Sequence, residues 1–432
     1  YCIGGKTRKM IGMCLWYQHV GATVAGKPRA DERVLGQVKA VVYVAGITEM
    51  GISHLLRVWN GLPHHALAPF AATIASPDIA VIVNVDVAQP GAAGISLPPV
   101  KAAGYDLICL YAAHGFGIIQ HFLSPRTNQR SDEYGGSLAN RARLMREIIG
   151  DAKDEVGDRC AITIRLALDE MAGPQGLDNA QIRELVAMHA ELPDLWDFAH
   201  GSWEQCSGTS RFKPEAAQED LIRGLKQLTP KPVVGVGRFT SPDLMARQIR
   251  QGILDFVGAA RPSIADPFLP RKIAEGRSDD IRECIGCNIC VSGDMTGAIS
   301  RCTQNTAFME EWRKGWHPEK ARPRGKSTGP VLVVGAGPAG LEAAMQLGRR
   351  GYDVTLAESG RTLGGRAAQE RQLPGLAAWG RVADYRIGQI QQMPNVQVYA
   401  ESRLSAEDIL GFGAEHVVVA TGARWRADGV AR

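Results

Sequence analysis

Residues 231–261 read KPVVGVGRFTSPDLMARQIRQGILDFVGAAR, two short apolar runs separated by one amphipathic stretch. Both apolar runs have the length of buried strands. Between them, apolar residues recur at helical spacing after Ser241 and Pro242, a pair typical of a helix start. A strand, a helix and a second strand in so short a segment indicate a βα unit of a parallel sheet.

The same alternation extends back to about Gly104, with three more apolar segments that are each followed by an amphipathic one. Strands are expected at 105–113, 160–168 and 194–201, and helices at 140–157, 179–192 and 220–228. Several such units in succession, with Arg and Gly at the strand ends, predict an α/β fold with a TIM (β/α)8 barrel. The functional site of such a barrel lies at the carboxyl ends of its strands.

The composition sets limits on the function. The chain has 432 residues, 45% of them hydrophobic and 22% charged, and a net charge of only +4. This charge gives no argument for nucleic acid as a partner, and no uninterrupted apolar run is long enough to predict a membrane span. Nine cysteines in a chain of this length favour a reducing compartment, so we expect a cytoplasmic protein.

Four of the cysteines crowd into ECIGCNICVSGDMTGAISRC, residues 283–302. Cys284, Cys287 and Cys290 follow the pattern C-x2-C-x2-C, and Cys302 comes after eleven intervening residues. Three closely spaced thiolates and a more distant fourth suit an iron–sulfur cluster. Zinc, which prefers two separated C-x2-C knuckles, and disulfides, which are difficult to form within one tight loop, are the weaker alternatives.

The segment GAGPAG, residues 335–340, joins an apolar strand to the start of a helix. Gly335, Gly337 and Gly340, with Pro338 among them, fit the pattern G-x-G-x-x-G, and Glu358 ends the next expected strand. The glycines allow backbone amides to approach a pyrophosphate, and the acid can accept a ribose hydroxyl. This predicts an ADP-containing dinucleotide site in a Rossmann-like domain, the alternative being a tight turn without a ligand.

Residues at the ends of the last barrel strands form a second anion-binding pattern. Gly237 and Arg238 follow one strand, and Ala260 and Arg261 follow the next. Backbone amides and arginines at this place make the usual phosphate site of the barrel. Arg165, at the end of an earlier strand, could approach the polar edge of a flavin ring, although a surface salt bridge is an equally simple explanation.

Tyr111 and His114 follow a further strand end in LYAAHGF, residues 110–116. A phenol and an imidazole at such a place could shuttle a proton or polarise a substrate. The alternative is a histidine that is only hydrogen-bonded.

FLSPRTNQRSDEYGGSLANRAR, residues 122–143, resembles the signature of the Old Yellow Enzyme-like NADH:flavin oxidoreductases. Together with the cysteine loop and GAGPAG, it makes the chain similar to their iron–sulfur branch, which includes trimethylamine and dimethylamine dehydrogenases and 2,4-dienoyl-CoA reductase. The C-x2-C-x2-C spacing resembles the amine dehydrogenases, because the dienoyl-CoA reductases have one more residue before the third cysteine.

The resemblance implies three parts: an FMN-binding barrel at 1–283, a [4Fe–4S] loop and linker at 284–329, and a partial ADP-binding domain for FAD or NAD(P) at 330–432. The barrel is expected to be incomplete at its N-terminal side, and the last domain to be incomplete at its C-terminal side. FMN phosphate would bind at Gly237, Arg238, Ala260 and Arg261, and the flavin ring would lie near Arg165. The four cysteines would hold the cluster.

The resemblance also implies roles in catalysis. Tyr111 and His114 match the catalytic pair, and Trp203 matches a substrate-binding tryptophan. Cys206 stands where relatives have an aspartate, and Asp294 where trimethylamine dehydrogenase has an aromatic residue, so trimethylamine is not the expected substrate.

The function so implied is the oxidative dealkylation of an amine or N-methyl amino acid, with electrons passing through the cluster to electron-transferring flavoprotein or a similar acceptor. The resemblance also allows a homodimer. The alternatives are an NAD(P)H-dependent enoate or 2,4-dienoyl-CoA reductase, and a degenerate chain that serves as an electron-transfer or structural subunit.

Overall fold

The computed structural model describes residues 19–21, 40–47, 79–85, 107–115, 117–207, 213–292, 300–326 and 329–423. The chain divides into two compact units. The barrel unit comprises Tyr1–Ser278 and Asn288–Cys302, and the Rossmann unit comprises Asp279–Cys287 and Thr303–Arg432. Asp294, for which the sequence analysis states an expectation, lies outside the described residues.

The barrel unit contains a closed ring of strands in the order β1 to β8. Their bounds are β1 His19–Gly21, β2 Ala40–Ile47, β3 Ile79–Val85, β4 Leu107–Ala112, β5 Ala161–Ala167, β6 Leu195–Ala199, β7 Val233–Val236 and β8 Phe256–Ala259. The strands from β2 to β8 pair in parallel, which confirms the expected barrel. The ring is closed on the N-terminal side, where the sequence predicted an incomplete barrel, by β1, which runs antiparallel to both β2 and β8.

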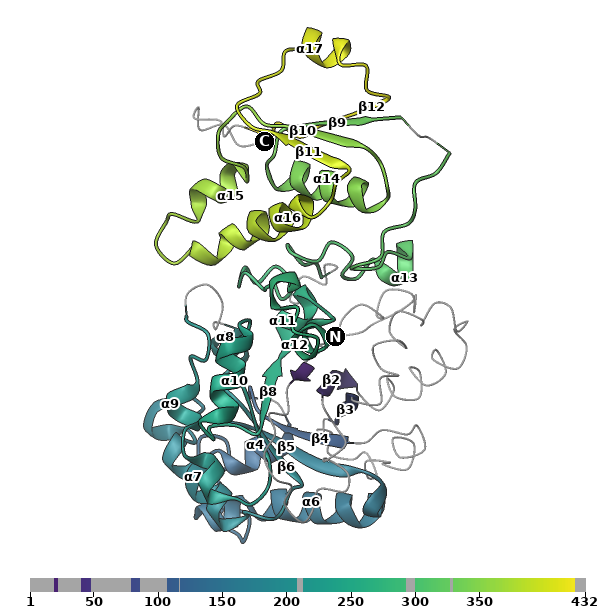
Figure 1. The fold of residues 1–432 in the computed structure, drawn as a ribbon. Helices are drawn as coiled ribbons and strands as arrows, with labels where there is room; N and C mark the ends of the chain where they lie inside the picture. The colour runs from purple at the N-terminus through teal and green to yellow at the C-terminus, as the bar shows by residue number, and fades with distance from the viewer. Residues whose placement is uncertain are drawn as a thin grey trace, which may run out of the picture. The chain divides into compact units, whose positions relative to one another are not determined.

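The helices of the barrel unit follow its strands, as Figure 1 shows. They are α4 Ile118–Leu123, α5 Leu138–Arg141, α6 Arg143–Val156, α7 Asn179–Met188, α8 Trp203–Ser207, α9 Glu219–Ile222, α10 Pro242–Arg250, α11 Ala260–Ala265 and α12 Leu269–Ala274. In α6, the buried residues Met145, Ile149 and Val156 recur at helical spacing, and the helix ends at Gly157, whose φ is 56°.

The prediction of a single helix at 220–228 is wrong. Gly224, with a φ of 89°, separates α9 from a 3₁₀ helix at Leu225–Leu228. The Arg183 guanidinium donates hydrogen bonds to the carbonyl oxygens of Leu221 and Arg223, at 3.1 and 2.7 Å. A side chain from α7 therefore satisfies the carbonyl groups that a continuous helix would have used.

The Rossmann unit is built on a parallel sheet in the order β11-β10-β9-β12. The strands are β9 Val331–Val334, β10 Val354–Ala357, β11 Val396–Tyr399 and β12 His416–Val419. The helices are α13 Glu311–Lys314, α14 Pro338–Arg349, α15 Gly365–Glu370, α16 Arg381–Gln391 and α17 Ala406–Gly411. The first strand of this unit lies between the second and the fourth, which is the strand order of a dinucleotide-binding fold.

Two helices of the Rossmann unit, α14 and α16, pack on one face of the sheet, and α17 lies on the other (Figure 1). The main core consists of Val331, Val333, Leu341, Met345 and Leu356 with their neighbours, all buried. Within the described residues, no helix has the length and apolar character that crossing a bilayer requires.

One buried ion pair lends itself to a test of stability in the barrel unit. Lys272 Nζ lies 2.8 Å from Asp266 Oδ2, and the two side chains are 0% and 1% exposed. We expect Lys272→Met to lower the free energy of unfolding by about 3–5 kcal/mol, because it leaves the Asp266 carboxylate buried without its cation. Urea denaturation followed by circular dichroism measures this change.

The matched control is Arg271→Met, which removes an exposed cation 3.9 Å from Glu275. It should change the free energy of unfolding by less than about 1 kcal/mol. Equal effects of the two substitutions would contradict the role given to the buried pair.

Candidate functional site

The register of three neighbouring strands brings the site together. Tyr111 on β4 pairs with Arg165 on β5, and Arg165 pairs with Asp197 on β6. Paired residues on adjacent parallel strands point to the same face of a sheet. The three side chains therefore form one row across the barrel wall, near the carboxyl ends of the strands.

Arg165 and Asp197 form a buried ion pair. Arg165 donates from Nη1 to Asp197 Oδ2 at 3.1 Å, and the two side chains are 5% and 0% exposed. A buried charge is tolerated only when an opposite charge and hydrogen bonds compensate for the lost water. The sequence interpretation of Arg165 did not include Asp197, although an acid inside the apolar strand LWDFA was a signal that it has a buried partner.

Tyr111 and His114 are also brought together. The Tyr111 hydroxyl is hydrogen-bonded to His114 Nδ1, and His114 forms a β-bridge with Ser202 beyond the end of β6. The backbone of His114 has a φ of 63°, a left-handed conformation that is costly for a residue with a Cβ. Such strain is concentrated at functional sites, where the surrounding structure holds it in place.

Burial keeps both side chains neutral. It lowers the pKa of His114 to about 3, with help from the positive charge of Arg165 and, when it is protonated, of His200. Burial also raises the pKa of Tyr111 well above its ordinary value, against the opposing effect of Arg165. A neutral imidazole has one donor and one acceptor nitrogen, so the phenol donates this hydrogen bond to His114 Nδ1 when the ring is the Nε2–H tautomer.

The segment after β6 adds further polar groups. Trp203 is the first residue of α8, and the position of its side chain is outside the description. Cys206 on the same helix is half-buried, and its charge would raise the pKa of Tyr111. His200, which the sequence interpretation missed, is 6% exposed, and its Nδ1 has no hydrogen-bond partner among the described residues.

At the end of β7, Gly237 allows another loop to pass close by. Its carbonyl accepts a hydrogen bond from the Ala216 amide at 2.9 Å, and a Cβ on Gly237 would lie 3.1 Å from Ala216 Cα. Arg238 has a φ of 54°, and its Nη2 donates to the Lys213 carbonyl at 3.0 Å. The glycine therefore has a packing role here, and the arginine is held at the strand end.

At the end of β8, Ala260 and Arg261 begin α11. The Arg261 guanidinium donates to Asn288 Oδ1 at 2.6 Å, and Asn288 lies between the second and third cysteines of the C-x2-C-x2-C motif. Two arginines at neighbouring strand ends fit an anionic phosphate in charge and position.

The four cysteines are divided between the units, with Cys284 and Cys287 in the Rossmann unit and Cys290 and Cys302 in the barrel unit. The Gly286 amide donates to Cys284 Sγ at 3.4 Å, a hydrogen bond typical of thiolates that bind a cluster. Among the described residues, no three His, Cys, Asp or Glu side chains are grouped so as to hold a metal ion. The cluster assignment therefore rests on ligand chemistry and spacing.

The glycines of GAGPAG have three different environments. Gly335 has a φ of 100° and passes close to Ala420, and a Cβ on Gly340 would collide with the Gly335 carbonyl. A Cβ on Gly337 would meet no described atom within 4 Å. The first and third glycines thus serve the turn and the packing of α14, and the second leaves room for a phosphate, which fits a dinucleotide.

Glu358 supports this turn from the end of β10. Its Oε2 accepts from the Ala336 amide at 2.7 Å and its Oε1 from the Gly360 amide at 2.8 Å. Oε1 also accepts from the Ser359 hydroxyl at 3.2 Å, whereas a second lone pair on Oε2 is compatible with a ribose hydroxyl. Pro338 is the first residue of α14, where proline suits a helix start.

Comparisons with known proteins add to this geometry. Residues 99–280 match the NADH:flavin oxidoreductase / NADH oxidase family, and residues 333–401 match the NAD(P)-binding Rossmann-like domain. The chain is 46% identical over 343 residues to dimethylamine dehydrogenase of Hyphomicrobium sp. (strain x), a match that covers 76% of this chain and 46% of the relative.

Two solved structures are similar to the chain. Histamine dehydrogenase from Rhizobium sp. 4-9 has a TM-score of 0.76 and 68% identity, with 78% of this chain and 48% of that chain covered. The amine oxidase for 6-hydroxypseudooxynicotine from Pseudomonas geniculata N1 has a TM-score of 0.75 and 53% identity, with 77% and 50% covered. The chain spans about half the length of the curated relatives it matches.

The depressed pKa of His114 predicts how stability depends on pH. Between its ordinary pKa of 6.5 and the folded value of about 3, the unfolded chain binds a proton that the folded chain does not. This contribution is complete above pH 6.5 and is lost as pH falls toward 3, at about 1.4 kcal/mol per pH unit.

His114→Gln should make the slope of unfolding free energy against pH shallower by about that amount between about pH 4 and 6. Urea denaturation at a series of pH values measures both slopes. Identical slopes for the wild type and the variant would show that the pKa of His114 in the folded chain is close to its ordinary value.

Proposed function

We propose that the chain, whose residues 99–280 match the NADH:flavin oxidoreductase / NADH oxidase family, is a flavin-dependent amine dehydrogenase. The observation that carries the proposal is the hydrogen-bonded pair of half-buried Tyr111 and buried His114 beside the Arg165–Asp197 ion pair, in a chain similar to several amine-oxidising proteins. The proposed substrate is a small amine or an N-methyl amino acid.

FMN is the proposed cofactor of the barrel unit. Arg238 and Arg261, with the backbone amides of Gly237 and Ala260, would hold its phosphate, and Arg165 would lie at the polar edge of its ring. When bound there, FMN supplies a two-electron acceptor. The Arg165–Asp197 pair keeps the guanidinium oriented, because its partner is itself buried on the next strand.

Tyr111 and His114 would bind and orient the amine nitrogen. The burial that depresses the pKa of His114 acts in the same direction on a bound ammonium ion, so the site favours the neutral amine. The neutral form has the lone pair from which oxidation to an iminium proceeds. Hydrolysis of the iminium then yields an aldehyde and the dealkylated amine.

Three further parts complete the proposal. Cys284, Cys287, Cys290 and Cys302 would bind a [4Fe–4S] cluster that passes electrons to electron-transferring flavoprotein or a similar acceptor. The glycine turn with Glu358 would bind ADP or the ADP part of FAD or NAD(P). The functional parts would follow the boundaries 1–283, 284–329 and 330–432, and two chains would form a homodimer.

An anaerobic spectrum separates this proposal from its alternatives. The purified chain should show flavin absorbance over a broad iron–sulfur background, and at least one member of a panel of methylated amines and N-methyl amino acids, other than trimethylamine, should bleach the flavin. Bleaching by NADPH but by no amine would favour an enoate or 2,4-dienoyl-CoA reductase. A chain without flavin absorbance would be a degenerate electron-transfer or structural subunit.

The Tyr111 hydroxyl provides the sharpest prediction for catalysis. Tyr111→Phe should slow anaerobic flavin reduction by an amine about 10²–10⁴-fold, because it removes the hydrogen-bonding group next to His114. Stopped-flow absorbance measures the rate.

Tyr134→Phe is the matched control for this prediction. The Tyr134 hydroxyl donates to Glu147 at 3.0 Å, away from this pair, so the rate should stay within about twofold of the wild type. Equal rates for all three proteins would remove Tyr111 from the proposed mechanism.

A further inference from the structure

Helix α16 of the Rossmann unit contacts the chain just before the first cysteine of the loop and just after the last. Arg381, at its start, forms an ion pair with Glu283 at 2.8 Å and donates to the Cys284 carbonyl at 3.3 Å. Gln304 donates from Nε2 to the Glu283 carbonyl at 3.0 Å. The segment before Cys284 and the segment after Cys302 are thus bound to each other and to the same helix.

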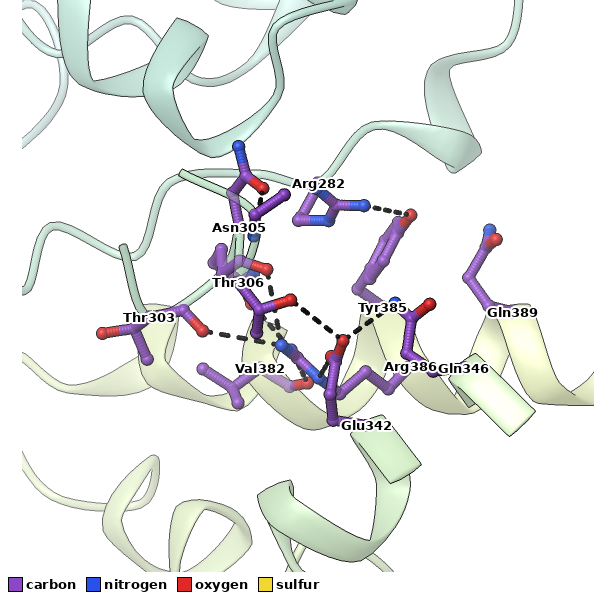
Figure 2. A network of polar contacts seen from close by, with 12 residues as sticks. Arg282, Thr303, Asn305, Thr306, Glu342, Gln346, Val382, Tyr385, Arg386 and Gln389 are labelled. Carbon is purple, nitrogen blue, oxygen red and sulfur yellow. Dashed lines mark hydrogen bonds and ion pairs between the residues drawn. The ribbon is translucent and has the colours of Figure 1, made fainter. Parts of the chain in front are cut away.

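Arg386, one turn further along α16, has every N–H group engaged, as Figure 2 shows for most of its contacts. Its Nε donates to Glu342 at 2.6 Å, and its Nη1 to Gln304 Oε1 at 3.0 Å and to the Val382 carbonyl at 2.8 Å. Its Nη2 faces the carbonyl oxygens of Thr303 and Gln304 at 3.5 and 3.4 Å. Arginine has five N–H donors, and five acceptors surround this one.

Because Arg386 is buried, its guanidinium needs a hydrogen-bond acceptor for each of its donors. The Arg386 side chain is 3% exposed and that of Glu342, on α14, is 20% exposed. A buried guanidinium is stable only where its donors are satisfied, so Arg386 fixes the backbone of Thr303 and Gln304 against α14 and α16. Lysine offers a single ammonium group and cannot replace the planar fork.

These contacts of Arg386 fix the position of Thr303. Its Oγ1 lies 3.2 Å from Cys287 Sγ. A thiolate can only accept a hydrogen bond, so the Thr303 hydroxyl is the donor whenever Cys287 is deprotonated. Hydrogen bonds to the sulfur ligands are one of the factors that set the reduction potential of an iron–sulfur cluster.

We propose that the Thr303 hydroxyl, held in place by Arg386, tunes the reduction potential of the redox centre bound through Cys287. Thr303 touches the sulfur, and Arg386 is a positioning residue that acts through Thr303. The inference rests on the proposed iron–sulfur cluster. Reduction adds negative charge to the centre, so a donor on its sulfur stabilises the reduced state and raises the potential.

Thr303→Val tests the hydroxyl directly. A redox titration with electron paramagnetic resonance detection should give a more negative midpoint potential for this variant than for the wild type. Thr303→Ser, which keeps the hydroxyl, should restore the wild-type value. An unchanged potential in Thr303→Val would overturn the proposal while leaving the cluster itself established.

Thr306→Val is the matched control in the same loop. The Thr306 hydroxyl contacts Glu342 Oε1 at 3.3 Å rather than a sulfur, so its removal should leave the potential unchanged. An equal shift in this control would overturn the proposal, because it would trace the change to the loop and not to the sulfur contact. Iron and acid-labile sulfide are measured first, and a wild type without them would overturn the proposed cluster and this inference together.

Arg386→Lys tests the positioning role. It should lower the midpoint potential in the wild-type background and produce no further shift in the Thr303→Val background, since both changes act on one hydrogen bond. Additive shifts would show that Arg386 acts on the cluster by another route. Arg371→Lys, in an exposed ion pair with Asp384 at 2.7 Å, is the control and should leave the potential as in the wild type.

Discussion

The ion pair between Arg165 and Asp197 is the constraint on which the candidate site depends. Both side chains are almost completely buried, so neither charge is stable without the other. The parallel register of β5 and β6 places them opposite each other, and the register of β4 adds Tyr111 to the same row. The closed barrel thus supplies a positive group whose orientation is set by the strands and not by a loop.

That positive charge also contributes to the neutral state of His114 in the neighbouring pair. Burial, and after it the charge of Arg165, keep His114 neutral, and the Nε2–H tautomer of the neutral ring accepts the hydrogen bond from Tyr111. The left-handed backbone of His114 turns the chain so that the imidazole meets the phenol three residues earlier. A neutral, hydrogen-bonding site beside a fixed cation suits an uncharged amine and an electron-accepting ring that develops negative charge.

Periodicity and turn chemistry predicted much of the fold, because the apolar runs of β4 to β8 and the glycine turn before α14 are determined locally. Contacts between distant segments could not be predicted in this way. The role of Asp197 can be recognised only once Arg165 is known to lie opposite it. The helix break at Gly224 is stable because Arg183, from another helix, donates hydrogen bonds to the carbonyl groups that the break leaves open. The antiparallel direction of β1 could likewise not be predicted, because it is a property of its pairing with β2 and β8.

The central claim is that this row of strand residues faces a bound flavin, and a crystal structure of the FMN-bound chain tests it most directly. The account predicts that the Arg165 guanidinium is within hydrogen-bond distance of the flavin ring while still paired with Asp197. It also predicts that Tyr111 and His114 face the reactive side of the ring. FMN bound elsewhere, or an Arg165 that points away from the ring, would contradict the account.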